Sequence, residues 1–194
     1  MKLKVRHSKR VPLASARGEW ALPPVRVGTL KPKKILAPVD FTECSQKSVT
    51  YAVSLAKHFH SEVILLHVAI LAPATPSPEL VALQSDMLNE QLRDDAEKQL
   101  SQWRDRVAAH VKASARMSSG VSVNDEIVAT ARETNCDLIV IATHAKGALA
   151  HLFSGSVAEK VVYHAPCPVL VVHEREHDFI QTRSRIGRSL VPAA

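Results

Sequence analysis

Apolar residues gather along the chain into five short runs, separated by longer segments with helical spacing. The runs cover residues 35–39, 63–68, 111–117, 138–142 and 169–172, and the third is the weakest. Short unbroken apolar runs are typical of parallel strands that helices cover on both faces. The intervening segments carry apolar residues three or four positions apart, as amphipathic helices do. The pattern therefore predicts the order β-α-β-α-β-α-β-α-β.

This alternation predicts an α/β fold with a doubly wound, five-stranded parallel sheet and helices on both faces. The longest predicted helix runs from Leu80 to Val107, after a loop over residues 71–78 that contains prolines. Gly120 introduces the third helix, which carries Ile127 at an apolar position. One domain of this kind accounts for most of a chain of 194 residues.

The segment from Asp137 to Val172 combines a buried strand, a loop, a capped helix and a second strand. Ser156 and Glu159 have the S-x-x-E spacing of a capping box directly after Gly155, so a helix is expected to begin there. Its first backbone N–H groups would face the loop and form a place for an anion. The same residues serve helix stability alone, since a cap contributes about 1 kcal/mol without any ligand. Both roles stay open.

The end of this segment resembles the universal stress protein family. Residues 164–172 have the sequence HAPCPVLVV, which matches the last strand of that family residue for residue. Nucleotide-binding members place G-x-x-G, nine residues and then G-[S/T] in the loop before the helix, and Gly155 with Ser156 matches the closing pair. The resemblance covers about residues 33–173. It implies the adenine nucleotide alpha hydrolase-like fold, with strand order 3-2-1-4-5.

The two opening glycines of that loop are replaced by Ala142 and Ala145. A glycine there allows positive φ or close approach of a phosphate to the backbone, and an alanine in left-handed geometry costs roughly 1–2 kcal/mol. Ala142 ends a strand, where negative φ suits alanine, so Ala145 is the more damaging change. The family contains members that bind adenine nucleotides and members that bind none, and the sequence leaves both open.

The resemblance also implies where a nucleotide would bind. ATP with Mg²⁺ is the implied ligand, at the carboxyl ends of the first and fourth strands, where such sheets bind ligands. Asp40 borders the adenosine pocket in the family, and its alternative role is to cap the helix that begins near Thr42. Val63 matches the position that packs on adenine, although a core valine is the ordinary expectation. The implied pocket residues are Pro38, Val39, Asp40, Val63, Ile141, Ala142, His144, Ala145, Gly155, Ser156, Val157 and Ala158.

The sequence gives little support for a catalytic function. It lacks the Walker A, G-x-S-x-G and H-E-x-x-H patterns, and its ten histidines are scattered without metal-ligand spacing. The resemblance therefore implies a stress-response regulatory or protective binding protein with an adenine-nucleotide pocket. The alternative is an ATP-binding protein with slow ATP hydrolysis, for which His144, Ser156 and Asp40 are the candidate residues on fold analogy alone.

Positive charge is concentrated at the amino terminus. Residues 1–34 hold ten Lys or Arg and one acidic residue, whereas residues 35–173 hold eleven basic and fifteen acidic residues. The sequence predicts a flexible basic extension over 1–32, the domain over 33–173 and a C-terminal tail over 174–194. Three roles stay open for the extension: a silent segment, an arm that attracts nucleic acid or an anionic surface, and a targeting peptide without a hydrophobic region.

The remaining expectations concern compartment and assembly. Three cysteines without CxxC or metal-ligand spacing fit a cytoplasmic protein with reduced thiols. No apolar run reaches the roughly 18 residues of a membrane span. The last strand would leave an apolar sheet edge if bare, and domains of the family pair there. The expected partner is a second copy, through Val169, Leu170, Val171 and Val172.

Overall fold

The computed structural model describes residues 28–70, 79–143, 157–173 and 180, without the side chains of residues 79–88. The chain divides into two compact units, Met1–Leu30 and Lys31–Ala194, and the sheet and helices lie in the second. The predicted loop at 71–78 and most of the predicted extension fall outside the described residues.

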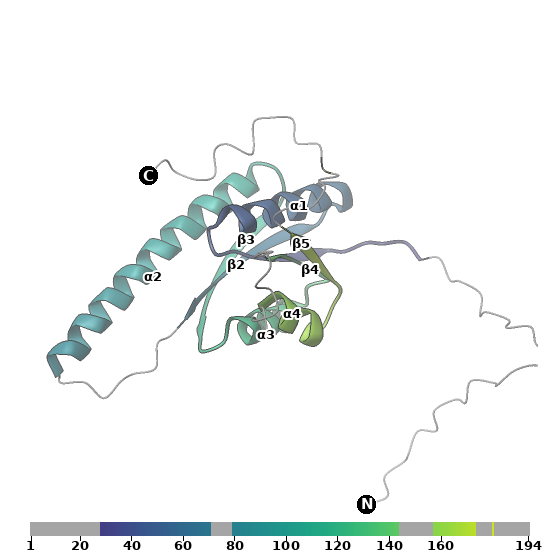
Figure 1. Cartoon of the computed structure of the whole chain (residues 1–194). Helices are drawn as coiled ribbons and strands as arrows, with labels where there is room; N and C mark the ends of the chain where they lie inside the picture. Colours follow the sequence, from purple (N-terminus) through teal and green to yellow (C-terminus); the bar gives the residue numbers. More distant parts are fainter. Residues whose placement is uncertain (1–27, 71–78, 144–156, 174–179, 181–194) are drawn as a thin grey trace, which may run out of the picture. The chain divides into compact units, whose positions relative to one another are not determined.

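Within the described ranges, parallel strands form one sheet in the order β3-β2-β1-β4-β5 (Figure 1). This order confirms the predicted doubly wound sheet, in which the chain winds outward from β1 in both directions. The strands are β1 (Lys34–Pro38), β2 (Glu62–Ile70), β3 (Ala113–Gly120), β4 (Leu138–Thr143) and β5 (Val169–His173).

Helices cover both faces of the sheet: Figure 1 shows α1 and α2 on one face, and α3 and α4 on the other. No helix within the described ranges is both long enough and apolar enough to cross a membrane. The helices are α1 (Glu43–Phe59), α2 (Glu79–Ala108), α3 (Val123–Thr134) and α4 (Val157–His164).

The alternation of side chains along the central strands explains the two layers of helices. Ile35 and Ala37 of β1 are fully buried in a cluster with residues of α1 and α2. Leu36, which lies between them, is buried in a second cluster with residues of α3 and α4. Successive side chains of a strand point to opposite faces, so a strand covered twice needs an unbroken apolar run.

The third strand differs in its bounds from the prediction. It begins at Ala113 rather than near Val111, and it continues past Met117 to Gly120, which pairs with Ile70 of β2. The sequence MSSG has low strand propensity, but the ladder of β2 holds it in the sheet. Gly120 is therefore the last residue of a strand, two residues before the N-cap of α3 at Ser122.

One residue of the predicted C-terminal tail contacts the core of the domain. Ile180, the residue of the tail that the structure describes, is partly buried and packs against the cluster that contains α1 and α2 residues. The predicted bounds of the tail, 174–194, stay a prediction, since the structure describes this one residue of it.

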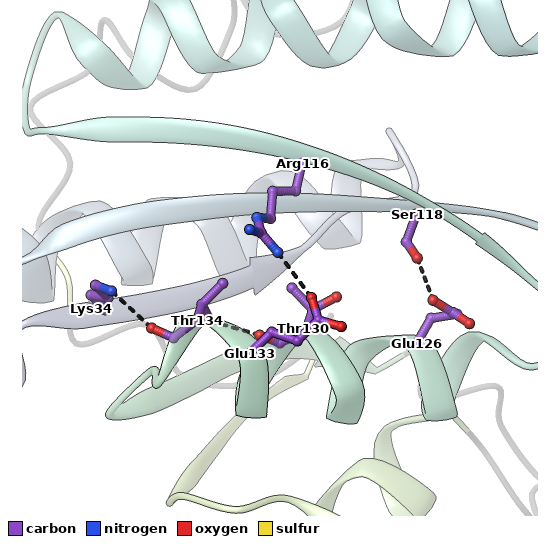
Figure 2. Close-up of polar contacts among 7 residues, drawn as sticks. All are labelled: Lys34, Arg116, Ser118, Glu126, Thr130, Glu133 and Thr134. Carbon is purple, nitrogen blue, oxygen red and sulfur yellow. Dashed lines mark hydrogen bonds and ion pairs between the residues drawn. The ribbon is translucent and has the colours of Figure 1, made fainter.

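Polar contacts fasten α3 to the sheet (Figure 2). The Lys34 ammonium of β1 donates to the carbonyl of Thr134 at 2.8 Å, at the end of the helix. Arg116 of β3 forms an ion pair with Glu133 at 3.2 Å, and the Ser118 hydroxyl donates to the Glu126 carboxylate. These contacts come from both ends of α3 and add to its apolar packing against the strands.

Candidate functional site

A cavity of about 240 Å³ opens where the carboxyl ends of β1, β2 and β4 meet. The chain winds from β1 toward β2 on one side and reaches β4 on the other, so this edge is the topological switch point at which doubly wound sheets bind ligands. The lining residues are Pro38, Val39, Asp40, Ser45, Leu66, His67, Val68, Ile70, Val123, Ile127, Ile141, Ala142 and Val157.

Six of the pocket residues expected from sequence line this cavity, and two lie elsewhere. Val63 is fully buried in the cluster with α1 and α2, and Ala158 is buried in the cluster with α3 and α4. Both serve as packing residues in positions away from the cavity lining. His144, Ala145, Gly155 and Ser156 lie outside the described residues. The six in the lining are Pro38, Val39, Asp40, Ile141, Ala142 and Val157.

The Asp40 side chain organises the turn between β1 and α1. One carboxylate oxygen of Asp40 accepts hydrogen bonds from the backbone N–H of Thr42 at 3.1 Å and from its hydroxyl at 2.6 Å. The Thr42 oxygen in turn accepts from the backbone N–H of Ser45 at 3.3 Å. Thr42 is therefore the N-cap of α1, and the expectation that Asp40 itself caps this helix is wrong. Asp40 holds the capping residue and remains at the exposed rim of the cavity.

Phe41 occupies a backbone conformation that phenylalanine rarely adopts. Its φ is 63°, in the left-handed region, between the end of β1 and the cap at Thr42. The ring stacks on His67 of the cavity lining, and it meets the ring of Trp103 in α2 edge to face at 5.8 Å. Left-handed geometry costs a non-glycine residue roughly 1–2 kcal/mol, and aromatic contacts contribute a similar amount. The two ring contacts offset the strain of the turn.

The hydrogen bond of His67 determines which of its ring nitrogens carries the proton. Nδ1 lies 2.9 Å from the carbonyl oxygen of Val39. A carbonyl can only accept, so Nδ1 is the donor, and in the neutral ring Nε2 is an acceptor. His67 thus links β2 to the end of β1 and places an imidazole in the wall of the cavity.

Ala142 lies inside β4, where it pairs with Val172 of β5. Its φ is not positive, in agreement with the expectation that this strand position suits alanine. The other residue at the carboxyl end of β4, Thr143, accepts a hydrogen bond from the Cys44 thiol at 3.6 Å through its carbonyl. This contact ties α1 to the strand beside the cavity.

The sequence analysis missed the whole wall formed by β2 and α3, and one lining residue of α1. Strand order alone contained a signal, because Pro38 pairs with Leu66 and the two carboxyl ends must then lie side by side. A histidine within the apolar run of β2 was a second signal. The missed lining residues are Ser45, Leu66, His67, Val68, Ile70, Val123 and Ile127.

The arrangement provides an apolar slot with a few polar groups at its rim. Aliphatic side chains from three strands and from α3 form the walls, which suits a flat ring. The Asp40 carboxylate accepts hydrogen bonds, as does Nε2 of a neutral His67. No group of three or more metal-ligating side chains occurs among the described residues. The described lining thus combines apolar walls with hydrogen-bonding groups at the rim.

Known proteins resemble the chain along the whole of the sheet. A family model described as the Universal stress protein family matches residues 31–173. Universal stress protein MJ0531 of Methanocaldococcus jannaschii is 35% identical over 153 residues, which cover 76% of this chain and 86% of that protein. The solved structure of universal stress protein UspA from Lactobacillus plantarum has a TM-score of 0.62 at 26% identity, covering 74% of this chain and 99% of that one.

A second solved structure has the same fold at lower identity. It is a universal stress protein in complex with cAMP, with a TM-score of 0.54 at 19% identity, and the match covers 74% of this chain and 99% of that one. At this level the likeness extends to the fold alone.

Proposed function

The chain belongs to the universal stress protein family, and on that premise we propose that its cavity binds the adenosine part of an adenine nucleotide. The protein then acts as a stress-response regulatory or protective binding protein whose state depends on the nucleotide. The observation that carries the proposal is the cavity at the switch point of the sheet, with apolar walls and the Asp40 carboxylate at its rim. The protein of the same fold that was solved with cAMP is consistent with this use of the fold.

The size of the cavity supports a fit to part of the proposed ligand. Sites that bury a drug-sized ligand have volumes of roughly 300–1,000 Å³, so about 240 Å³ suits a base with part of its sugar rather than a whole triphosphate. Aliphatic walls such as Val68 and Ile127 would pack on the faces of the purine. Asp40 would accept from the ribose hydroxyls.

The phosphates would extend from the cavity toward the amino end of α4. Gly155 and Ser156, the residues expected from sequence to hold phosphate, directly precede that helix in the chain. Backbone N–H groups at a helix N-terminus favour anions. Mg²⁺ usually reaches a protein with the phosphates of its nucleotide and keeps several waters, so ATP itself would supply most of the oxygen ligands of the ion.

Calorimetric titration with Mg-ATP, AMP, cAMP and Mg-GTP tests the proposal. Ala142→Leu puts a larger side chain into the lining and should abolish adenine-nucleotide binding. Ala109→Leu makes the same change at an exposed position and should leave binding unaltered. Protein purified from cells and then denatured should also release ATP, ADP or AMP. Equal affinity of both variants, or no heat with any adenine nucleotide, would contradict the proposal.

We also propose that two copies pair through β5. This strand pairs with β4 on one side and lies at the end of the strand order. Its side chains Val169, Leu170 and Val171 are only partly buried, and the neighbouring α4 exposes Tyr163 to 85%. A second copy would cover this apolar edge and complete its ladder.

Light scattering should therefore report twice the mass of the chain at micromolar concentration. Val171→Glu places a charge in the edge and should give a monomer, whereas Val121→Glu, at a position that is 84% exposed, should not. The thermal midpoint of each variant separates loss of the dimer from loss of the fold. A monomeric unmodified chain would refute the pairing.

A cytoplasmic location is part of the same proposal. All three cysteines of the chain, Cys44, Cys136 and Cys167, are free thiols. Free thiols are typical of proteins in a reducing compartment. Osmotic shock releases proteins that lie outside the cytoplasmic membrane. A fluorescent fusion of this protein should remain in the cytoplasmic fraction after such a shock.

A further inference from the structure

Two cysteine side chains that are far apart in the sequence meet near the amino ends of β4 and β5, whereas the cavity lies at the carboxyl ends of the strands. The sulfur atoms of Cys136 and Cys167 lie 3.6 Å apart, in hydrogen-bonding contact. One residue separates Cys136 from the start of β4, and one residue separates Cys167 from the start of β5. Cys136 belongs to the cluster of buried residues between the sheet and α3 with α4, and the partly buried Cys167 packs against that cluster. This pair serves no role in the nucleotide site.

The backbone around each cysteine is firmly held. The N–H of Cys136 donates to the carbonyl of Ala131 at 3.1 Å, where α3 ends. Asp137 is bound through its carboxylate to the N–H groups of residues 33 and 34 at 2.7 and 3.0 Å. On the other side, Pro168 accepts at 3.0 Å from the N–H of Ile139 in β4. The two chain segments are thus joined to each other and to the sheet.

A disulfide needs the sulfurs to approach from 3.6 Å to about 2.05 Å. Because the backbone beside each cysteine is held, rotation of the two side chains about Cα–Cβ would have to supply this movement. The backbone contacts keep the two thiols together in every copy of the folded protein, so their effective concentration for each other is high.

The two thiols differ in access and in proton affinity. Cys136 is 7% exposed, and burial raises its pKa to about 12, with the neighbouring Cys167 and Asp137 adding to the effect. Burial also raises the pKa of Cys167, but the hydrogen bond from Cys136 opposes this. Cys167 is only partly buried. Cys167 is therefore the thiol that ionises and meets an oxidant first, while Cys136 retains its proton and donates it.

We propose that Cys136 and Cys167 form a redox-sensitive dithiol, which a hydroperoxide oxidises to a disulfide that joins the starts of β4 and β5. The Cys167 sulfur attacks the peroxide, the O–O bond breaks, and an alcohol or water leaves, so that Cys167 becomes a sulfenic acid. The Cys136 sulfur then attacks Cys167; an S–S bond forms, the S–O bond breaks, and the oxygen leaves as water with the Cys136 proton. Two electrons pass to the peroxide, and a dithiol such as dithiothreitol returns the pair to the reduced state.

Tryptic digestion resolves this proposal because each cysteine falls on its own peptide. Cleavage after Lys and Arg places Cys44 in 35–47, Cys136 in 133–146 and Cys167 in 161–175. The folded full chain is treated with hydrogen peroxide, blocked with N-ethylmaleimide and digested without reductant. The expected product is 133–146 joined to 161–175, with 35–47 carrying the blocking group. The rate should rise about tenfold per pH unit below the pKa of Cys167, because the thiolate is the nucleophile.

Matched variants separate this pair from random oxidation. Cys44→Ala should form the same joined peptide at the same rate. Cys136→Ala should leave Cys167 as a sulfenic acid that dimedone traps, while the unmodified chain gives little trapping. Chain unfolded in urea should form joined peptides that include 35–47. The proposal is overturned if folded protein links 35–47 to another peptide, if it yields only disulfides between two chains, or if dimedone labels Cys136 in preference to Cys167.

Discussion

The ring of Phe41 stacks on the ring of His67, with the centroids 4.5 Å apart and 26° between the planes. Phe41 has a left-handed backbone conformation in the turn after β1, and His67 of β2 lines the cavity. The His67 ring also donates to the Val39 carbonyl, so it contacts the chain both at the end of β1 and at Phe41 in the turn. The shape of the cavity rim therefore depends on an aromatic contact that a change at either residue would remove.

Two substitutions at Phe41 separate backbone strain from ring contact. Phe41→Ala removes the contacts to His67 and Trp103 and keeps a left-handed residue with a side chain. Phe41→Gly removes the same contacts but relieves the strain. The glycine variant should therefore be the more stable of the two by about 1 kcal/mol, as measured by urea unfolding. Equal stability would mean that the φ of 63° carries no cost.

The sheet with helices on both faces was predictable because strands buried on both faces appear in the sequence as unbroken apolar runs. The strand order followed from the family resemblance. Runs such as residues 138–142 have no polar position for solvent, and helical spacing separates them. The end of β3 was not predictable, since MSSG lies in the sheet only because β2 offers it a ladder. Local propensity and tertiary pairing disagree there, and the pairing determines the outcome.

The candidate site was predictable at β1 and β4, where the resemblance supplied the residues, and not at β2 and α3. The positive φ of Phe41 is unreadable from the sequence, because it is held by rings 26 and 62 positions away in the chain. From the sequence, Asp40 was considered as a cap of α1 and Thr42 was not. In the structure Thr42 is the cap, because its side-chain oxygen accepts from the N–H of Ser45, while Asp40 accepts from the Thr42 hydroxyl.

Protonation of the Glu62 carboxylate in acid should make the domain less stable. The Lys112 ammonium lies 2.9 Å from its carboxylate and is the main reason that the pKa of Glu62 falls below 4.5, although burial opposes the shift. Ser114 donates to the other carboxylate oxygen at 2.9 Å. A lowered folded-state pKa gives stability that is present above about pH 4.5 and is lost as the pH falls through the folded-state pKa.

Glu62→Gln removes this titration. The difference in unfolding free energy between the unmodified chain and the variant should shrink as the pH is lowered from about 6 to about 3.5, in urea titrations at each pH. Lys112→Met should have a similar effect, because it removes the main cause of the shift. Added salt should weaken the effect, because the Lys112 side chain is 78% exposed. A constant difference across this range would show that Glu62 titrates alike in the folded and unfolded chains.

Deletion of residues 1–30 should leave the thermal midpoint of the domain unchanged. The sheet and its helices lie within the unit Lys31–Ala194, which the deletion leaves intact. The basic residues of the deleted segment should account for any nucleic-acid binding by the full chain, which is then expected to fall steeply with salt and to vanish on deletion. Filter binding of a labelled duplex at two salt concentrations checks this. Sequence-specific binding by the truncated chain would contradict it.

Ala142→Gly should lower the stability of the domain, whereas Ala145→Gly should raise its affinity for Mg-ATP. Ala142 lies within β4 at a φ that is not positive, so glycine brings no conformational benefit and should cost roughly 0.5–1 kcal/mol of stability. Ala145 takes the place of the second opening glycine in the phosphate loop that the family resemblance implies. If that position needs left-handed geometry around bound phosphate, glycine should raise the affinity for Mg-ATP about tenfold.

Titration of both variants with Mg-ATP and with adenosine distinguishes the causes. A gain confined to Ala145→Gly and to the phosphorylated ligand would place the deficit at the phosphates, because adenosine occupies the cavity alone. A gain for adenosine as well would mean that the substitution acts on the cavity itself. No gain for either ligand would contradict the assignment of Ala145, because a strained alanine would then carry no share of the binding free energy.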